Sequence, residues 1–246
     1  AEEGYQVWRD YVTNFGLGQK SNIDLPNELE GFVPEVAYYD RYYRKGGWKS
    51  LTIVSLAIGQ GELGFTPMQM ANMTATIANR GFYITPLLVK EIEGGESIDE
   101  RYRQKHFTTI DTASYGPVVD GMDLVINGGP GSTARNARIE GIRVCGKTGT
   151  AENPHGNDHS IFIAFAPKDD PKIAIAVYVE NQGFGTTYAA PIASLMIEKY
   201  LTGEVKRTWY ENWVMQLVQP AAPARKKDST ESDTIQINQT EDGTEE

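Results

Sequence analysis

Two stretches of alternating apolar residues, separated by a short polar turn, restrict the fold of this chain most strongly. Apolar side chains occupy every second position before the turn, at Ile161, Ile163 and Phe165, and after it, at Ile173, Ile175, Val177 and Val179. The turn itself reads PKDDPK at 167–172. Because successive side chains of a strand point to opposite faces, this pattern predicts an antiparallel hairpin.

The segments on either side extend this hairpin into a layered fold. We predict a further strand at 141–150, so that 141–150, 160–167 and 173–180 form one antiparallel sheet. The segment Tyr188–Leu201 is apolar at helical spacing and is followed by Gly203, which favours a helix lying across one face of that sheet.

Residues 1 to about 135 are predicted to consist mainly of helices and loops. Apolar residues recur at spacings of three and four between Tyr5 and Phe15. A second helix begins at Thr66-Pro67 and ends at Asn79-Arg80-Gly81, and a third covers Ser114–Ile126. The fold class is therefore α+β, an antiparallel sheet with a C-terminal helix plus a helical subdomain.

Composition narrows the class of protein. The chain has 246 residues, of which 40% are hydrophobic, enough for one globular domain of ordinary core size. Its one cysteine excludes a disulfide within the chain, and its net charge of −10 argues against nucleic acid as the main partner. We divide the chain into residues 1–218 and a flexible acidic tail at 219–246, which includes PAAPA at 220–224 near its beginning.

The strongest local motif is GKTGTA at 146–151. With Gly141 it also matches the phosphate-loop pattern G-x-x-x-x-G-K-[ST], but that motif needs an apolar strand before it and a helix at the lysine. Polar residues precede Gly141, and helix-breaking residues follow Thr148. We therefore favour an extended strand edge, where Lys147, Thr148, Gly149 and Thr150 offer an ammonium, two hydroxyls and a backbone N–H to an anionic peptide end.

Other motifs in the chain match a known family in the same order. These are FGLG at 15–18 with IDLP at 23–26, GQG at 59–61, TPMQMA at 66–71, NRG at 79–81, GKTGTA at 146–151 and FIAFAP at 162–167. Together they resemble the transpeptidase domain of class B penicillin-binding proteins over about residues 11–201. The spacing from IDLP to GQG looks most like the penicillin-binding protein 2 branch, the enzymes of cell-wall elongation.

The family's nucleophile motif is missing from this sequence. None of the ten serines has a lysine three positions further on, and S-x-N is absent as well. In the family both motifs lie upstream of FGxG, so we interpret residues 1–218 as the C-terminal part of a transpeptidase domain. This chain alone is expected to be inactive, because a serine hydroxyl needs an adjacent base to become a nucleophile.

Two other functions stay open. A β-lactamase or carboxypeptidase relative has the same fold, although the GQG and TPMQMA motifs argue against it. A non-catalytic module that binds peptide ends on the KTGT strand is the alternative of a different class. An S-x-x-K and an S-x-N encoded upstream would favour the enzyme, and their absence would favour the module.

The resemblance implies specific roles and partners. Lys147 would be the catalytic residue in this chain, and Lys147, Thr148, Gly149 and Thr150 would bind substrate, with no cofactor and no metal. The implied partners are peptidoglycan stem peptides, β-lactams and the cell-wall elongation machinery. The intact protein would act on the periplasmic face of the inner membrane, anchored by an N-terminal segment that this chain lacks.

The remaining chemically reactive residues are interpreted as structural. His155 and His159 are expected in a loop rather than at a metal, because Gly156, Asn157 and Asp158 between them disfavour a helix. Cys145 is predicted to be a core thiol. The aromatic run from Tyr38 to Trp48 is predicted to form a loop packed over the cleft.

Overall fold

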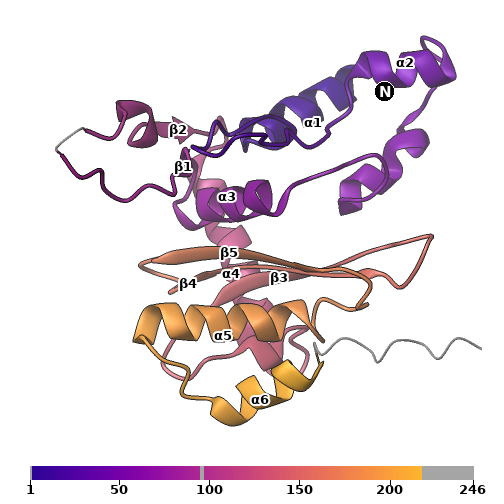
Figure 1. Ribbon diagram of the computed structural model, residues 1–246. Coiled ribbons are helices and arrows are strands. Elements are labelled where there is room, and N and C mark those ends of the chain that lie inside the picture. Colours follow the sequence, from indigo (N-terminus) through magenta and orange to yellow (C-terminus); the bar gives the residue numbers. More distant parts are fainter. Residues whose placement is uncertain (1, 95–96, 218–246) are drawn as a thin grey trace, which may run out of the picture.

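The computed structural model describes residues 2–94 and 97–217, so the predicted tail at 219–246 lies outside the described residues. Three strands form its main sheet: β3 (Cys145–Ala151), β4 (His159–Ala166) and β5 (Ile173–Val179). They pair antiparallel in the order β3-β4-β5, which confirms the predicted hairpin. This sheet lies in the middle of the molecule, between two helical layers (Figure 1).

The first strand begins later than predicted. Gly141 has a φ of +75°, in the left-handed region, and Ile139 and Ile142 form an isolated bridge around it. The chain therefore turns at 139–142, and regular pairing with β4 begins only at Cys145, opposite Phe165.

One face of the sheet packs against α5 (Ala189–Thr202), as the apolar spacing predicts. Their shared core includes Phe162, Ala164, Ala193 and Ile197, all fully buried. A further helix, α6 (Thr208–Leu217), packs on α5 through Leu195, Tyr210 and Val214. The α6 helix was not predicted.

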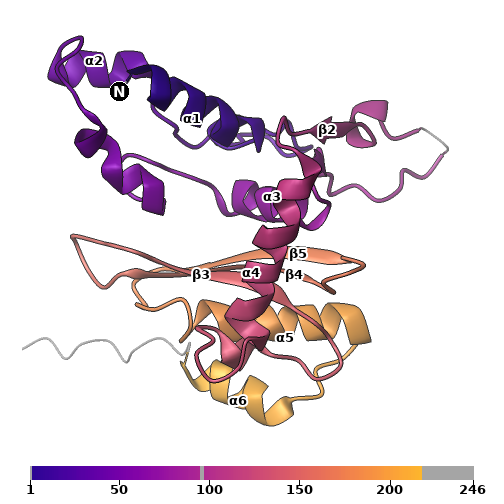
Figure 2. The same cartoon turned by 180° about the vertical axis from the view of Figure 1, so that it is seen from behind.

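The other face packs against α3 (Pro67–Ala78) and the first half of α4 (Tyr115–Asn127). Thr66 and Gln69 form a capping box at the start of α3, and the buried Gln69 amide also donates to the carbonyls of Gln19 and Glu30, both at 2.8 Å. Met122 of α4 belongs to the core on this face, whereas Ile126 belongs to the core shared with α5. The α4 helix therefore passes from one layer to the other, as Figure 2 shows.

The outer N-terminal part contains α1 (Glu2–Asn14), α2 (Val36–Tyr43) and the 3-10 helix η1 (Ser50–Ile58). Tyr5, Tyr39 and Trp48 form an aromatic core with ring centroids 5.2–5.8 Å apart. The prediction of a loop at Tyr38–Trp48 is therefore wrong, because this segment contains α2 and its rings pack on α1.

Short elements complete the fold. Strands β1 (Phe82–Ile84) and β2 (Lys105–Phe107) form a separate hairpin, and single 3-10 turns occur as η2 (Glu100–Tyr102), η3 (Thr112–Ser114) and η4 (Arg135–Ala137). No helix in the described part of the chain is long and apolar enough to cross a bilayer. The α+β class is confirmed.

Candidate active site

The KTGT motif lies on β3, the edge strand of the described sheet. The beginning of this edge is covered by α4, since Val119 and Met122 pack against Cys145 and the Asn127 amide donates to the Val144 carbonyl at 3.0 Å. The remainder, from Lys147 onward, is half-buried or exposed. The α4 helix therefore covers only the beginning of the edge and leaves the KTGT part accessible.

Strand register assigns the motif's side chains to two faces. Lys147 and Gly149 pair with Ile163 and Ile161, whereas Thr148 and Thr150 pair with Phe162 and Ser160. Paired residues share a face, so both threonines lie on the α5 side and Lys147 lies on the α3 side. One ligand can meet both faces only by lying along the edge itself.

Lys147 is exposed, and its ammonium donates to the Thr148 carbonyl at 2.6 Å. Within residues 2–94 and 97–217 it forms no ion pair with a carboxylate. Its positive charge is therefore available to an anion that approaches the edge.

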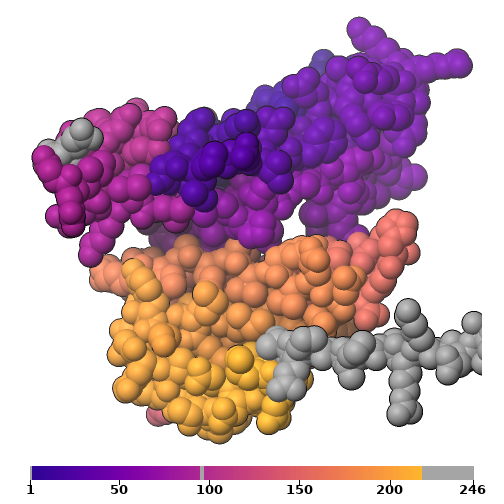
Figure 3. Space-filling view, viewed as in Figure 1, coloured from indigo at the N-terminus to yellow at the C-terminus, as the bar shows by residue number. Residues whose placement is uncertain are grey.

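A cleft of about 550 Å³ opens at the end of β3. Its walls come from the GQG loop, including Gln60, and from the end of the sheet, including Ala151, Asp158, His159 and Tyr178. The Gln60 amide donates to the Thr150 carbonyl at 3.3 Å. In Figure 3 the purple N-terminal layer meets the orange sheet layer along a seam.

A loop at 183–187 approaches the motif from the α5 face, and sequence reasoning missed it. A Cβ on Gly185 would lie 2.5 Å from the Gly149 carbonyl oxygen and 2.2 Å from that of Ile161, so only glycine fits there. Ser160 fastens this loop by donating to the Phe184 carbonyl at 2.9 Å. The two closely spaced glycines of GFGTT at 183–187 were the available signal.

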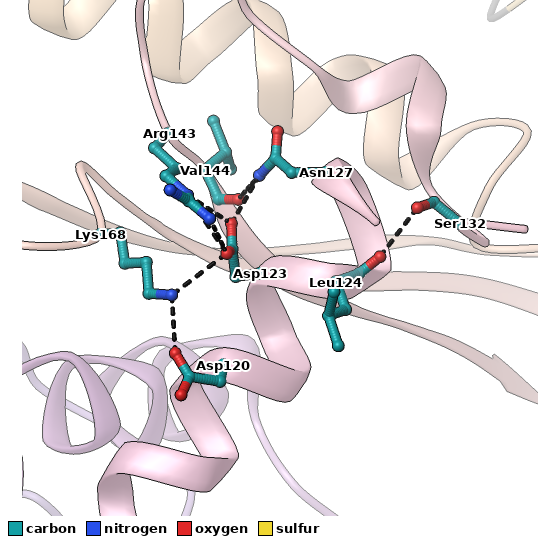
Figure 4. A network of polar contacts seen from close by, with 8 residues as sticks. All are labelled: Asp120, Asp123, Leu124, Asn127, Ser132, Arg143, Val144 and Lys168. Carbon is teal, nitrogen blue, oxygen red and sulfur yellow. Dashed lines mark hydrogen bonds and ion pairs between the residues drawn. The ribbon is translucent and has the colours of Figure 1, made fainter. Parts of the chain in front are cut away.

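A charge network around the buried carboxylate of Asp123 flanks the other end of β3 (Figure 4). Asp123 of α4 is 3% exposed and accepts hydrogen bonds from Arg143, Asn127 and Lys168. The closest contact joins its Oδ2 to Arg143 Nη2 at 2.5 Å, and Lys168 Nζ also reaches Asp120 at 2.7 Å. Arg143, followed by Lys168 and Asn127, lowers the pKa of Asp123 to about 2 against the opposing effect of burial.

The reactive residues outside the motif have structural surroundings. Burial raises the pKa of the Cys145 thiol to about 12, which confirms its prediction as a core thiol. His155 lies in the β3–β4 loop as expected, whereas the loop prediction is wrong for His159, which is the first residue of β4. The Nδ1 atom of His159 accepts the Asn181 N–H at 3.1 Å. Among the described residues no group of three or more potential ligands could hold a metal ion.

Comparison with known proteins identifies the family. The penicillin-binding protein transpeptidase domain matches residues 2–198. Peptidoglycan D,D-transpeptidase MrdA of Haemophilus influenzae is 29% identical, covering 93% of this chain and 36% of that protein. Its counterpart from Acinetobacter baumannii is 32% identical, covering 80% of this chain and 31% of that protein.

Solved structures similar to this chain belong to the same family. Penicillin-binding protein 2 (PBP2) of Pseudomonas aeruginosa, in complex with WCK 5153, is 33% identical with a TM-score of 0.72, covering 84% of this chain and 47% of that one. PBP2 of Helicobacter pylori in complex with MreC is 25% identical with a TM-score of 0.66, covering 81% of this chain and 36% of that one.

The chain belongs to the penicillin-binding protein transpeptidase family. Within it, the similarity is to class B proteins of the penicillin-binding protein 2 (MrdA) group, which confirms the expected branch. The chain spans about a third of the length of the curated relatives it matches.

Proposed function

We propose that this chain forms the KTGT side of a serine D,D-transpeptidase site, in a protein that cross-links peptidoglycan stem peptides. The observation that carries the proposal is the position of Lys147–Thr150 on the edge strand of the described sheet, half-buried or exposed, in a chain of the transpeptidase family. An extended peptide can lie along such an edge and end against its polar groups.

Each motif residue has a defined task in this proposal. The hydroxyls of Thr148 and Thr150 hold the terminal carboxylate of the stem peptide, and the Lys147 ammonium on the other face adds positive charge beside the nucleophile. A serine hydroxyl attacks the carbonyl of the last peptide bond, and the Thr150 N–H stabilises the negative oxygen that forms. The terminal D-amino acid leaves, and the amine of a second stem peptide later displaces the serine from the acyl-enzyme.

The serine of this reaction comes from outside the 246 residues in the proposal, because no S-x-x-K occurs among them. β-Lactams would acylate the same serine and place their carboxylate on the KTGT strand. We also propose, from the resemblance to penicillin-binding protein 2, that the parent protein works with the elongation machinery at the periplasmic face of the inner membrane. The H. pylori relative in complex with MreC supports such an assembly.

Covalent labelling tests this proposal. We expect no adduct when the 246-residue chain is incubated with a fluorescent penicillin and its intact mass is measured. A longer protein that adds an S-x-x-K segment upstream should be labelled stoichiometrically. In that protein Lys147→Ala should slow acylation more than Thr150→Ala, because the Thr150 backbone donor survives its substitution.

Three results would count against the proposal. A stoichiometric adduct on any serine of the 246-residue chain would refute the external nucleophile. Unchanged acylation in both variants of the longer protein would make the KTGT strand structural. A gene without S-x-x-K upstream would favour a non-catalytic module that binds peptide ends.

A further inference from the structure

Two side chains link the N-terminal layer, residues 2–94 and 97–111, to the sheet layer, residues 139–217, by hydrogen bonds in the described structure. Gln60 donates to the Thr150 carbonyl at 3.3 Å, and Arg80 donates to the Lys168 carbonyl at 3.2 Å. Gln60 precedes α3 and Arg80 follows it, and they reach opposite ends of the sheet. Both hydrogen bonds join the same two layers, but only the one from Gln60 reaches the KTGT strand.

The loop that carries Gln60 is held rigidly. Gly59 ends η1 with a φ of +80°, and the Gln60 N–H donates to the Ser55 carbonyl at 3.1 Å. Gly61 has a φ of +75°, and a Cβ there would lie 2.6 Å from Ser55 Oγ. Glycine on both sides thus allows a tight turn that directs the Gln60 amide toward β3.

Thr150 is the last residue but one of β3, where an edge strand frays most easily. The N–H and C=O of one strand residue point to the same side of the strand. Because the Thr150 carbonyl accepts from Gln60, a residue outside the sheet, we expect its N–H to face away from β4 too. That is the direction from which a ligand would approach the edge.

We propose that Gln60 is a positioning residue that fixes the backbone of Thr150, so that its N–H is held toward the reacting oxygen. This inference rests on the proposed function. The Gln60 amide does not touch the substrate; it restrains the peptide group that follows Thr150. Without it, the end of β3 would sample orientations in which the N–H no longer points along the edge.

The test uses the full chain labelled with 15N and 13C. Gln60→Leu removes the amide donor, Gln60→Lys retains an N–H donor on a longer side chain, and Arg80→Leu is the matched control at the opposite end of the sheet. Three quantities are measured: the backbone NMR signals of Thr150, the dissociation constant for N-acetyl-D-alanyl-D-alanine, and the thermal unfolding midpoint.

We expect Gln60→Leu to move the Thr150 carbonyl and amide signals and to weaken peptide binding about fivefold, the loss of one ordinary hydrogen bond. Gln60→Lys should restore affinity to within about twofold of the original chain. Arg80→Leu should lower the unfolding midpoint while leaving the Thr150 signals and the affinity unchanged.

The inference is wrong if Gln60→Leu leaves the Thr150 signals and the affinity unchanged. It is also wrong if Arg80→Leu weakens binding as much as Gln60→Leu, since general loosening of the layers would then explain both. An unsubstituted chain that binds no peptide would contradict the proposed function instead, and the Thr150 carbonyl signal would still decide whether Gln60 restrains the strand.

Discussion

The two halves of β3 are held in place by different means. Its beginning lies under α4, beside Asp123, whose carboxylate is buried and bonded to Arg143, Asn127 and Lys168. Its end, from Lys147, lies at the surface, and among the described residues one side-chain hydrogen bond from outside the sheet, from Gln60, reaches it. One end of β3 is thus held by buried contacts, and the other end is accessible to solvent.

Under the proposed function, this difference lets the strand offer a binding edge without loss of order. The buried Asp123 carboxylate, held by several hydrogen bonds, sets the position of the strand where no ligand needs to reach. The exposed half keeps its polar groups available because the core does not use them. Stability and function should therefore respond to substitutions in different halves of β3.

The largest effect on stability should come from Asp123→Ala. It removes the buried carboxylate that accepts hydrogen bonds from Arg143, Asn127 and Lys168, which should lower the free energy of unfolding by about 3 kcal/mol. Urea unfolding followed by circular dichroism measures this loss. Asp120→Ala is the matched control, because the Asp120 side chain is 69% exposed, and it should cost less than about 1 kcal/mol. Equal losses would mean that the buried network is not the anchor.

The second largest effect on stability should come from acid, which protonates Asp123 and removes its hydrogen bonds to Arg143 and Lys168. The pKa of Asp123 is about 2 in the folded chain, below the value of about 3.9 for an unfolded aspartate. Its contribution is therefore fully present above about pH 5, and roughly 2 kcal/mol is lost as the pH falls toward 2. Unfolding free energies between pH 6 and pH 2 measure the loss. Asp123→Asn should flatten that part of the profile, and an unchanged slope would contradict the assignment.

The smallest effect on stability should come from the exposed half. Lys147→Ala and Thr148→Val should each change the unfolding free energy by less than about 0.5 kcal/mol, because neither side chain is buried. Isothermal titration with N-acetyl-D-alanyl-D-alanine should nevertheless show about tenfold weaker binding for Lys147→Ala, the cost of a charge-assisted contact. A destabilisation as large as that of Asp123→Ala would remove the contrast between the halves.

Local patterns predicted much of the fold. The alternation at 161–179 specified the hairpin, and the Thr66-Pro67 start specified α3, because each depends on residues close in sequence. The α2 helix was missed because its N-cap, Glu35, makes no side-chain capping bond and the segment has no helix start signal. The η1 helix was missed as well, because its apolar residues do not recur at a helical or strand spacing.

The candidate site was predicted in part. The motif itself indicates which chemical groups Lys147, Thr148 and Thr150 offer, namely an ammonium and two hydroxyls. The contacts around them are not, because the Gln60–Thr150 bond joins residues 90 positions apart and the close approach of Gly185 depends on where α5 lies. The Arg143–Asp123 pair likewise has no sequence signature, since many acidic residues could have met that arginine.

Mapping of ligand contacts by NMR tests the central claim most directly. The labelled 246-residue chain is titrated with N-acetyl-D-alanyl-D-alanine, and backbone shifts are followed residue by residue. We predict saturable shifts confined to Lys147–Ala151 and the adjoining Gln60 and Gly185 loops, with signals around Asp123 unmoved. Saturable shifts centred elsewhere, or none at millimolar peptide, would contradict the assignment of the exposed half of β3 as the binding edge.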